Sequence, residues 1–328
     1  MNRAAGPRSR TTARTPRARA AWAGVVLLVW SLLAACASTS GADDLDLQPA
    51  ASAPPSTPSA PTTTPPDCNP VASYAPTTTA GPSVEAIRQR GVLRVGVSAD
   101  TYLMGSRNPF TDQIEGFDID MARYVAQAIL GDPDKVQLVV ITSAQRVDAL
   151  TSGQVDMVAR AFTMTCARWE QIGFSAEYFH AGQKVLVATD STATGLADLP
   201  EGTRVCAAGG TTTLTQLEQD YPQVVPVPAA THTGCLAAFQ QGQVDAITAD
   251  DTILAGLVAQ DPYAKVVGDA VSDEPYGLGV PADQPDLAAY VNGVLEQVKA
   301  DGRWTASYDR WLSVLGPAPT PPQAVYGR

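Results

Sequence analysis

The sequence predicts an α/β fold with two lobes, because the same pattern of strands and helices occurs twice along the chain. Three short apolar runs alternate with two helix-like stretches between residues 94 and 159, and this order recurs between residues 204 and 248. Both copies close on nearly the same phrase, Gly153-Gln154-Val155-Asp156 and Gly242-Gln243-Val244-Asp245. Apolar β-branched runs that alternate with helices are typical of parallel strands buried under helices. Each copy therefore predicts a βαβαβ sheet flanked by helices.

The elements of the two copies correspond one to one. The first copy has expected strands at 94–97, 136–141 and 154–159 and expected helices at 118–130 and 144–152. The second has expected strands at 204–207, 223–227 and 243–248 and expected helices at 211–220 and 233–241. Ligands of open α/β sheets bind at the carboxyl ends of the strands. Two such sheets therefore predict a ligand in the cleft between the lobes.

Residues 1–35 have the organisation of an export signal. Six arginines precede residue 20, and an apolar run from Ala21 to Ala35 ends in small residues. This run is too short for a transmembrane helix. The ending Leu33-Ala34-Ala35-Cys36 resembles a bacterial lipobox, which implies cleavage before Cys36 and a lipid on its sulfur. An ordinary signal peptide with an incidental cysteine is the alternative.

The segments that flank the folded part are rich in proline. Residues 36–82 contain ten Pro and many Ser and Thr, and such a composition cannot bury enough apolar surface to offset chain entropy. We therefore expect a tether at 36–82 and a disordered tail at 317–328. The remaining chain predicts lobe 1 at 83–186 plus 275–316 and lobe 2 at 187–274. The expected hinges are Val185 to Thr189 and Tyr276 to Gly279.

The charge of the chain argues against a nucleic-acid partner. After removal of the signal, sixteen Lys and Arg face thirty-three Asp and Glu, whereas nucleic acid requires a basic face. An anionic ligand would have to be bound by specific local groups and not by the overall field. No cysteine or histidine spacing resembles a zinc motif, so neither a metal nor a cofactor is expected.

Four cysteines remain if Cys36 carries a lipid, and they allow three pairings. Disulfides are permitted outside the cytoplasm. Cys206 lies on the first strand of the second copy and Cys235 opens its second helix, so these two can be neighbours. Cys68 would then pair with Cys166. A set of unpaired buried thiols is the alternative.

Charged and polar groups follow the strands of both copies. Arg168 comes after the third strand of the first copy and can bind a carboxylate bidentately. Asp250 ends the third strand of the second copy and can bind an ammonium group. Gly209-Gly210-Thr211-Thr212 connects a strand to a helix, where backbone N–H groups favour an anion. Taken singly, each has an ordinary interpretation, as a surface ion-pair partner, a helix cap or a turn.

Several motifs together resemble the type II solute-binding proteins of polar amino-acid ABC importers, in particular the glutamine/glutamate-binding lipoproteins of actinobacteria. They occur in the family's order between residues 85 and 315. The motifs are Gly116-Phe117-Asp118-Ile119-Asp120-Met121, Thr163-Met164-Thr165-x-x-Arg168, Gly209-Gly210-Thr211-Thr212, Val244-Asp245-Ala246-x-x-x-Asp250 and Asp301-Gly302-Arg303-Trp304-x-x-x-Tyr308-x-x-Trp311-Leu312.

The resemblance implies a role for each site residue. Arg168 would bind the α-carboxylate of an amino acid, with N–H groups near Thr163 and Thr212. Asp250 would bind the α-ammonium group with the carbonyl of Ala161. The family places an aromatic ring over the ligand, and Tyr102 is the candidate here. Many relatives have a small residue where this chain has Arg160, and two arginines suit a ligand with two carboxylates; an outward-facing Arg160 is the alternative. We expect both His180 and His232 to be structural or exposed.

The expected function is that of a lipid-anchored monomeric receptor on the outer face of the cell membrane. It would bind glutamate or aspartate, with weaker binding of glutamine or asparagine, by closure of the cleft. The membrane partner would be an ABC permease or, alternatively, a sensor protein. A dehydratase-like enzyme on this fold would need a catalytic acid or base, for which Asp100, Glu115 and Asp250 are the candidates. A structural wall lipoprotein would not need Arg and Asp at matched strand ends.

Overall fold

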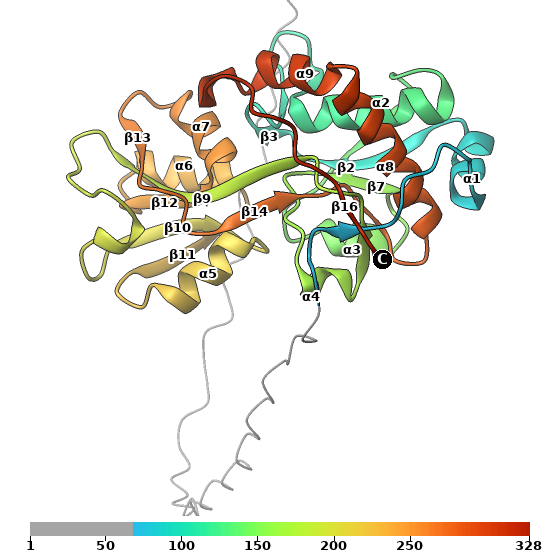
Figure 1. Ribbon diagram of the computed structural model, residues 1–328. Helices are drawn as coiled ribbons and strands as arrows, with labels where there is room; N and C mark the ends of the chain where they lie inside the picture. Colours follow the sequence, from blue (N-terminus) through green and yellow to red (C-terminus); the bar gives the residue numbers. More distant parts are fainter. Residues whose placement is uncertain (1–67) are drawn as a thin grey trace, which may run out of the picture. The chain divides into compact units, whose positions relative to one another are not determined.

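The computed structural model describes residues 68–328 and confirms the two-lobe α/β architecture (Figure 1). Lobe 1 is built on a five-stranded sheet with the order β6-β2-β7-β15-β8. Its strands are β2 (Leu93–Val97), β6 (Val136–Val140), β7 (Met157–Ala159), β8 (Ile172–Phe174) and β15 (Gly279–Pro281). Its helices are α1 (Pro82–Arg90), α2 (Phe117–Leu130), α3 (Arg146–Thr151), α4 (Cys166–Trp169), α8 (Pro285–Ala300) and α9 (Arg303–Trp311).

Lobe 2 is built on a second sheet with the order β11-β10-β12-β9-β13, in which β14 also pairs with β9. Its strands are β9 (Phe179–Ala188), β10 (Arg204–Ala208), β11 (Val225–Ala229), β12 (Ala246–Asp250), β13 (Ala264–Val267) and β14 (Asp273–Tyr276). Its helices are α5 (Thr212–Asp220), α6 (His232–Gln240) and α7 (Asp251–Val258), and a 3-10 turn covers Leu196–Asp198. Figure 1 shows α6 and α7 on one face of this sheet and α5 on the other.

Each of the two sheets has a core of three parallel strands. In lobe 1 the central β2 pairs in parallel with β6 and β7, and in lobe 2 the central β10 pairs in parallel with β11 and β12. The repeated βαβαβ pattern of the sequence therefore corresponds to the same strand order in both lobes. Because all six strands are parallel within their sheets, each sheet presents its carboxyl ends along one edge.

The chain crosses between the sheets twice. The second crossing lies between β14 and β15, at the expected Tyr276 to Gly279. The first lies between β8 and β9, at residues 175–178, and the expectation of a hinge at Val185 to Thr189 was wrong. The reason is the length of β9. Its first half pairs with β14 and packs against Phe117 of lobe 1, whereas Val185 lies in its second half, which pairs with β12 and β13 inside the sheet of lobe 2.

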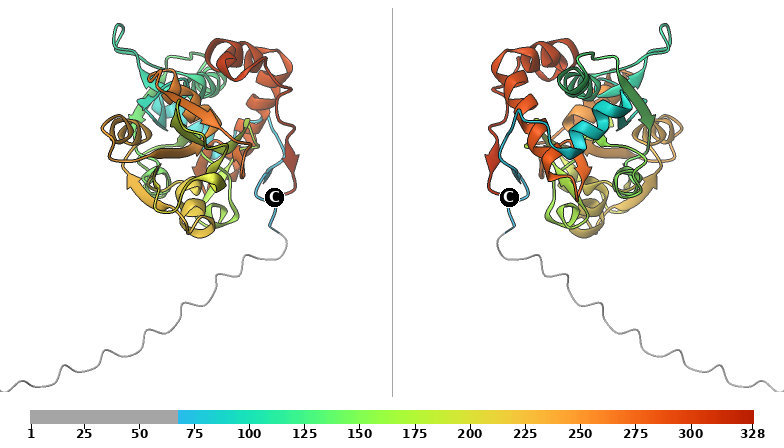
Figure 2. Two further views of the ribbon diagram at one scale, coloured as in Figure 1. Left: turned by 90° about the vertical axis from the view of Figure 1, so that its left-hand side faces the viewer. Right: turned by 90° about the vertical axis from the view of Figure 1, so that its right-hand side faces the viewer.

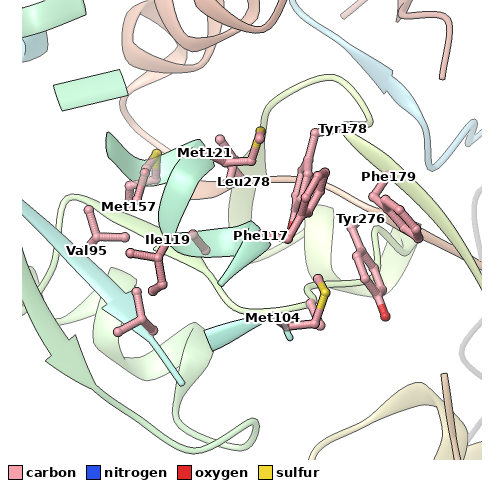
Figure 3. Close-up of a cluster of buried hydrophobic side chains, with 14 of the residues drawn as sticks. Val95, Met104, Phe117, Ile119, Met121, Met157, Tyr178, Phe179, Tyr276 and Leu278 are labelled. Atoms are coloured by element: carbon pink, nitrogen blue, oxygen red, sulfur yellow. The ribbon is translucent and has the colours of Figure 1, made fainter. Parts of the chain in front are cut away.

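An aromatic cluster lies where the crossing strands meet lobe 1 (Figure 3). Phe117 at the start of α2 contacts Tyr178 and Phe179, with ring centroids 6.2 and 5.5 Å apart, and Phe179 stacks on Tyr276 at 5.9 Å. Trp304 of α9 completes the cluster and donates from its indole to the carbonyl of Tyr178 at 2.7 Å. Large rings that are fully buried and hydrogen-bonded stabilise one geometry, which here fixes where Tyr276 lies.

The expected disorder at both flanks was wrong for the described residues. Residues 72–73 (β1) pair in parallel with residues 325–326 (β16), so the ends of the described chain lie side by side (Figure 2). The Arg328 guanidinium lies 3.8 Å from the centre of the Trp169 ring, and the Trp169 indole donates to Pro70 at 2.7 Å. Proline-rich segments are extended. Two such segments can pair as β-strands through the backbone groups of their non-proline residues. We call residues 68–74 and 317–328 the terminal clamp.

Three short strands separate β2 from α2. They are β3 (Asp100–Thr101), β4 (Gly105–Arg107) and β5 (Ile114–Glu115), and they form a small antiparallel sheet. Leu103 adopts a left-handed backbone with φ of 75° between β3 and β4. This turn buries the side chain of Met104 and leaves Tyr102 44 % exposed. It therefore decides which side chain of this loop faces the ligand cleft. A second 3-10 turn, Ser313–Leu315, follows α9.

Candidate functional site

A cavity lies between the lobes at the carboxyl ends of the parallel strands. It contains about 370 Å3 of atom-free space, its solvent mouth included. All six parallel strands contribute to its wall directly or through the segment that follows them. The lining residues are Ser98, Thr101, Met104, Asp118, Ser143, Arg146, Arg160, Ala161, Thr163, Thr211, Thr212, His232, Asp250 and Ile253.

Asp250 is a buried carboxylate in the wall of this cavity. It ends β12, is 5 % exposed and accepts a 2.5 Å hydrogen bond from the Tyr276 hydroxyl. Burial, with Glu274 nearby, raises the pKa of Asp250 to about 8. The raised pKa means that the Tyr276 hydroxyl and Arg146 do not offset the burial of this carboxyl group. An ammonium group in the cavity would supply a compensating cation, as the sequence analysis expects.

Arg168 is not among the residues that line the cavity, but it lies beside Thr163 of the cavity wall and reaches both lobes. Its Nη1 donates to the Thr163 carbonyl at 2.5 Å and its Nη2 to the Gly210 carbonyl at 3.2 Å. Burial lowers the pKa of Arg168 to about 10, and Glu274 and Asp250 oppose this shift. The guanidinium therefore bonds to neutral carbonyls in this structure, although a carboxylate would be a stronger acceptor.

The threonines expected at the site lie beside Arg168, but their hydroxyls have protein partners. Thr163 and Thr212, one from each lobe, each donate to Glu274 at 2.6 Å. Thr211 caps α5, where its hydroxyl accepts from Leu214 at 3.2 Å and donates to the Ala208 carbonyl at 2.7 Å. Sequence reasoning did not include Glu274, a 2 % exposed carboxylate on β14. Thr163 of lobe 1 thus binds Glu274 of lobe 2 across the cleft, whereas Thr212 binds Glu274 within lobe 2.

Arg160 faces inward and is 3 % exposed, so the outward-facing alternative is wrong. Its Nε donates to the Ile141 carbonyl at 2.8 Å, and its Nη1 donates to the Ser143 hydroxyl. Burial lowers the pKa of Arg160, while Asp100 and Asp118 oppose the shift. The side chain is thus fixed in direction by one carbonyl and one hydroxyl, with its charge directed at the cavity.

Arg146 is a third arginine of the site, and sequence reasoning missed it. It begins α3, is 3 % exposed and packs its guanidinium 4.3 Å from the centre of the Phe162 ring. It donates to the Ala161 carbonyl at 2.8 Å and, across the cleft, to the Gly210 carbonyl at 3.0 Å. The Ala161 carbonyl, expected to accept from the ligand, is therefore occupied by Arg146.

None of these three arginines has a carboxylate partner in the described part of the chain. No Asp or Glu oxygen of residues 68–328 lies within 4.0 Å of Arg146, Arg160 or Arg168. Burial, together with Arg168 and Arg160, lowers the pKa of Arg146 well below its usual value. Unpaired buried charges are costly. Two arginines, Arg146 and Arg160, and two carboxyl groups, Asp118 and Asp250, therefore line the cavity without an ion pair between them.

His232 also lines the cavity and was missed. It begins α6, is 2 % exposed, and neither ring nitrogen has a hydrogen-bond partner among the described residues. The expectation that it is structural does not fit two unpaired buried nitrogens. His180 does behave as expected: it lies on β9 outside the cavity and pairs with Glu177 at 2.8 Å.

Tyr102 does not line the cavity, so its expected place over the ligand was wrong. The left-handed turn at Leu103 points Met104 inward instead, with 1 % exposure. The backbone of Tyr102 nevertheless marks a close approach of the lobes. A Cβ atom on Gly256 of α7 would lie 2.4 Å from the Tyr102 carbonyl oxygen. Asp100, near the start of the same loop, accepts a hydrogen bond from Thr233 of lobe 2. The cleft is closed in this structure.

Both expected disulfides are present. Cys206–Cys235 joins β10 to α6, the helix that carries His232, and Cys68–Cys166 joins the terminal clamp to α4. Each therefore fixes an element close to the cavity or to its edge. The signal at 1–35, the lipidation site Cys36 and the tether up to residue 67 lie outside the described residues. No helix within residues 68–328 combines the length and apolar character needed to cross a membrane.

Two α/β lobes that close over a charged cavity at their strand ends define a solute-binding protein of the two-lobe class. Residues 93–314 match the bacterial extracellular solute-binding proteins, family 3, and the chain belongs to this family. The resemblance inferred from the motifs is thereby confirmed.

Known relatives of the chain include transport proteins for amino acids. It is 34 % identical over 230 residues to the ABC transporter glutamine-binding protein of Bacillus subtilis, covering 70 % of this chain and 84 % of that protein. It is 31 % identical over 244 residues to a glutamate-binding protein of Corynebacterium efficiens, covering 71 % and 81 %. The crystal structure of an L-cysteine receptor of Neisseria gonorrhoeae matches with a TM-score of 0.67 and 30 % identity, covering 71 % and 95 %.

Proposed function

We propose that this protein is an extracytoplasmic receptor for an acidic amino acid, glutamate or aspartate, with glutamine and asparagine bound more weakly. The observation that carries the proposal is a pair of buried arginines in the cavity wall, Arg146 and Arg160, with Arg168 beside Thr163 of that wall. None of the three has a carboxylate within 4.0 Å in the described chain. One arginine suffices for an α-carboxylate. The remaining charge suits a second carboxylate.

The cavity supports one orientation of such a ligand. The α-ammonium group would bind Asp250, whose burial the Tyr276 hydroxyl and Arg146 do not offset. The α-carboxylate would bind Arg168 and N–H groups near Thr163 and Thr212. The side-chain carboxylate would then face Arg160, which the Ile141 carbonyl and the Ser143 hydroxyl hold in position. The names of the relatives, glutamine-binding and glutamate-binding, are consistent with either an acid or an amide at this end.

The proposed partner is an ABC permease, which would recognise the closed form. Closure of two lobes about a hinge is a common means by which such proteins signal ligand binding. A relative described as an ABC transporter protein supports this partner. A membrane sensor protein remains the alternative partner, and co-purification from membranes with the ligand present would distinguish the two.

Membrane attachment through a lipid on Cys36 is part of the proposal. The sequence Leu33-Ala34-Ala35-Cys36 supports it. A Cys36→Ala variant should appear in the culture medium or keep its signal, whereas the wild-type protein should fractionate with membranes. A wild-type protein that is processed yet fully soluble would contradict the anchor.

A dehydratase-like enzyme on the same fold is the rival function. Of its candidate acids and bases, Asp250 and Asp100 lie near the cavity and both are engaged in hydrogen bonds to Tyr276 and Thr233. Glu115 accepts from Asn108 at 2.7 Å and does not line the cavity. Incubating the protein with each amino acid and analysing the ligand by mass spectrometry tests this: a receptor returns the ligand unchanged.

The test of the ligand class is Arg160→Ala, measured against glutamate and glutamine by calorimetry. If Arg160 binds the side-chain carboxylate, the variant should lose more affinity for glutamate than for glutamine. The preference should shrink by about one to two orders of magnitude, at 1.4 kcal/mol per tenfold. Equal losses for the two ligands would show that Arg160 does not distinguish the acid from the amide. Arg303→Ala, far from the cavity and paired with Asp301 at 2.6 Å, is the matched control.

A further inference from the structure

His232 is the least satisfied polar side chain around the cavity. It is 2 % exposed, and both its ring nitrogens are buried without a hydrogen-bond partner in the described chain. Buried imidazoles without partners are rare because each unpaired nitrogen costs free energy. His232 lines the cavity, so a molecule bound there can supply the partner.

The surroundings of His232 favour an anion at that position. The residue begins α6, a nine-residue helix whose N-terminal N–H groups carry partial positive charge. Arg160 and Arg146 are the cations that influence its titration. His232 follows β11 and Asp250 ends β12, and β10 lies between these two strands in the sheet. His232 therefore lies on the side of lobe 2 away from the proposed ammonium site.

We propose that His232 takes up a proton from solvent when a ligand with a side-chain carboxylate binds, and that this proton makes the closed cleft selective for acids over amides. The inference rests on the proposed function, because it requires an acidic ligand in this cavity. The imidazole goes from neutral to imidazolium and donates N–H to the carboxylate, which stays ionised. An amide ligand, being neutral at this end, gives no such stabilisation of the imidazolium.

The protonation state of His232 without ligand determines how the affinity for an acidic ligand depends on pH. Burial and then Arg160 lower the pKa of His232 to about 3, so the ring is neutral at any pH between 5 and 8. A carboxylate within hydrogen-bond distance raises that pKa in the complex. At a pH between the His232 pKa without ligand and its pKa in the complex, binding takes up a proton. The affinity for the acidic ligand therefore rises as pH falls, by at most about tenfold per pH unit.

The charged groups around the ring are few. Arg160 and Arg146 oppose protonation, and Asp100, on β3 against α6, favours it. Of the other elements packed on α6, β12 carries Asp250 at its carboxyl end and α7 begins with Asp251. Arg204 begins β10, at the opposite end of that strand from the cavity. The ligand carboxylate would therefore add a second anion to Asp100 beside the ring.

Histidine NMR tests the proposal directly. The chain has two histidines, and His180→Gln removes the one outside the cavity, whose side chain is 54 % exposed. The remaining imidazole signal then reports His232. At pH 6 we expect a neutral ring without ligand, a neutral ring with saturating glutamine and a protonated ring with saturating glutamate or aspartate. A neutral ring in the glutamate complex would overturn the inference and leave the proposed receptor function intact.

Calorimetry in buffers of different ionisation enthalpy gives the proton count. Binding of any amino acid can release a proton from Asp250 to the buffer, so the measured quantity is the difference between glutamate and glutamine. We expect glutamate to take up about one proton more than glutamine at pH 6. In His232→Gln the difference should vanish, and the glutamate preference should fall by about tenfold or more. An unchanged difference in a folded His232→Gln would contradict the proposal. If glutamate and aspartate fail to bind at all, the proposed function itself is wrong.

Discussion

Asp250 illustrates at the scale of one residue how binding and stability oppose each other. Its folded-state pKa, about 8, lies above the ordinary value of 3.8. A carboxyl group shifted in this direction destabilises the fold as pH rises from the lower value to the higher one. We therefore expect Asp250→Asn to raise the melting temperature of the unliganded protein at pH 8, with a gain that shrinks toward pH 4. About 2–4 °C per kcal/mol is the scale for a domain of this size.

The same Asp250→Asn substitution should remove ligand binding. Loss of one partner of a desolvated charge pair costs about 2–5 kcal/mol, which calorimetry would register as a loss of affinity for every amino acid. Asp251→Asn is the neighbouring control, since Asp251 begins α7 and does not line the cavity. A variant that is neither more stable at pH 8 nor weaker in binding would show that Asp250 does not face the ammonium group.

Arg168→Ala should differ from Arg160→Ala in its selectivity. If Arg168 binds the α-carboxylate, which all amino acids share, the variant should lose affinity for acids and amides alike, by about 2–5 kcal/mol. Parallel titrations with glutamate and glutamine check this. A loss confined to glutamate would place the side-chain carboxylate, and not the α-carboxylate, at Arg168.

Residues of the site differ in how well the sequence reveals them. Thr163 and Arg168 follow the third strand of the first copy, and Asp250 ends the third strand of the second copy. All three stand within motifs, so their place could be predicted. Arg146 and His232 follow the second strands, β6 and β11, and begin helices with no motif around them. The repeat could have indicated both residues, because β6 and β11 occupy equivalent edges of the two sheets and the segments after them lie at equivalent places. The inward turn of Met104 depends on one left-handed residue, Leu103, which composition does not reveal.

At the scale of elements, the terminal clamp should contribute to stability without contributing to binding. The Cys68–Cys166 disulfide closes 98 residues, and a loop of about 100 residues corresponds to roughly 4–5 kcal/mol of stabilisation in the chain-entropy account. We expect deletion of residues 317–328, or the double variant Cys68→Ser/Cys166→Ser, to lower the melting temperature while glutamate affinity stays within about threefold. A large loss of affinity in the deletion variant would mean that the clamp shapes the cleft.

The elements themselves were predictable where local patterns decide them, and less so elsewhere. Alternating apolar runs and helices located the parallel strands of both lobes. The crossing at 175–178 was not predictable in this way, because β9 is a continuous strand whose two halves pair with different partners. The terminal clamp was missed because proline-rich composition indicates a lack of core and does not reveal that β1 and β16 would pair.

At the scale of the whole molecule, closure should depend on glycines where the lobes approach. Gly256 lies within α7, and a Cβ atom there would lie 2.4 Å from the Tyr102 carbonyl oxygen of lobe 1. Alanine is favoured over glycine inside a helix by about 1 kcal/mol. We expect Gly256→Ala to stabilise the unliganded protein and to weaken all amino-acid ligands by about tenfold or more. Calorimetry gives the affinity and small-angle scattering the closure; unchanged affinity would refute a closed binding form.

The central claim is that the cavity between the lobes selects an acidic amino acid by paired opposite charges. Titration calorimetry of the wild-type protein with the twenty common amino acids, at one pH and ionic strength, tests it most directly. We expect glutamate or aspartate to bind most tightly, glutamine and asparagine to follow, and cationic and apolar amino acids to bind least. Tightest binding of glutamine, arginine or cysteine, or binding of none of the twenty, would contradict it.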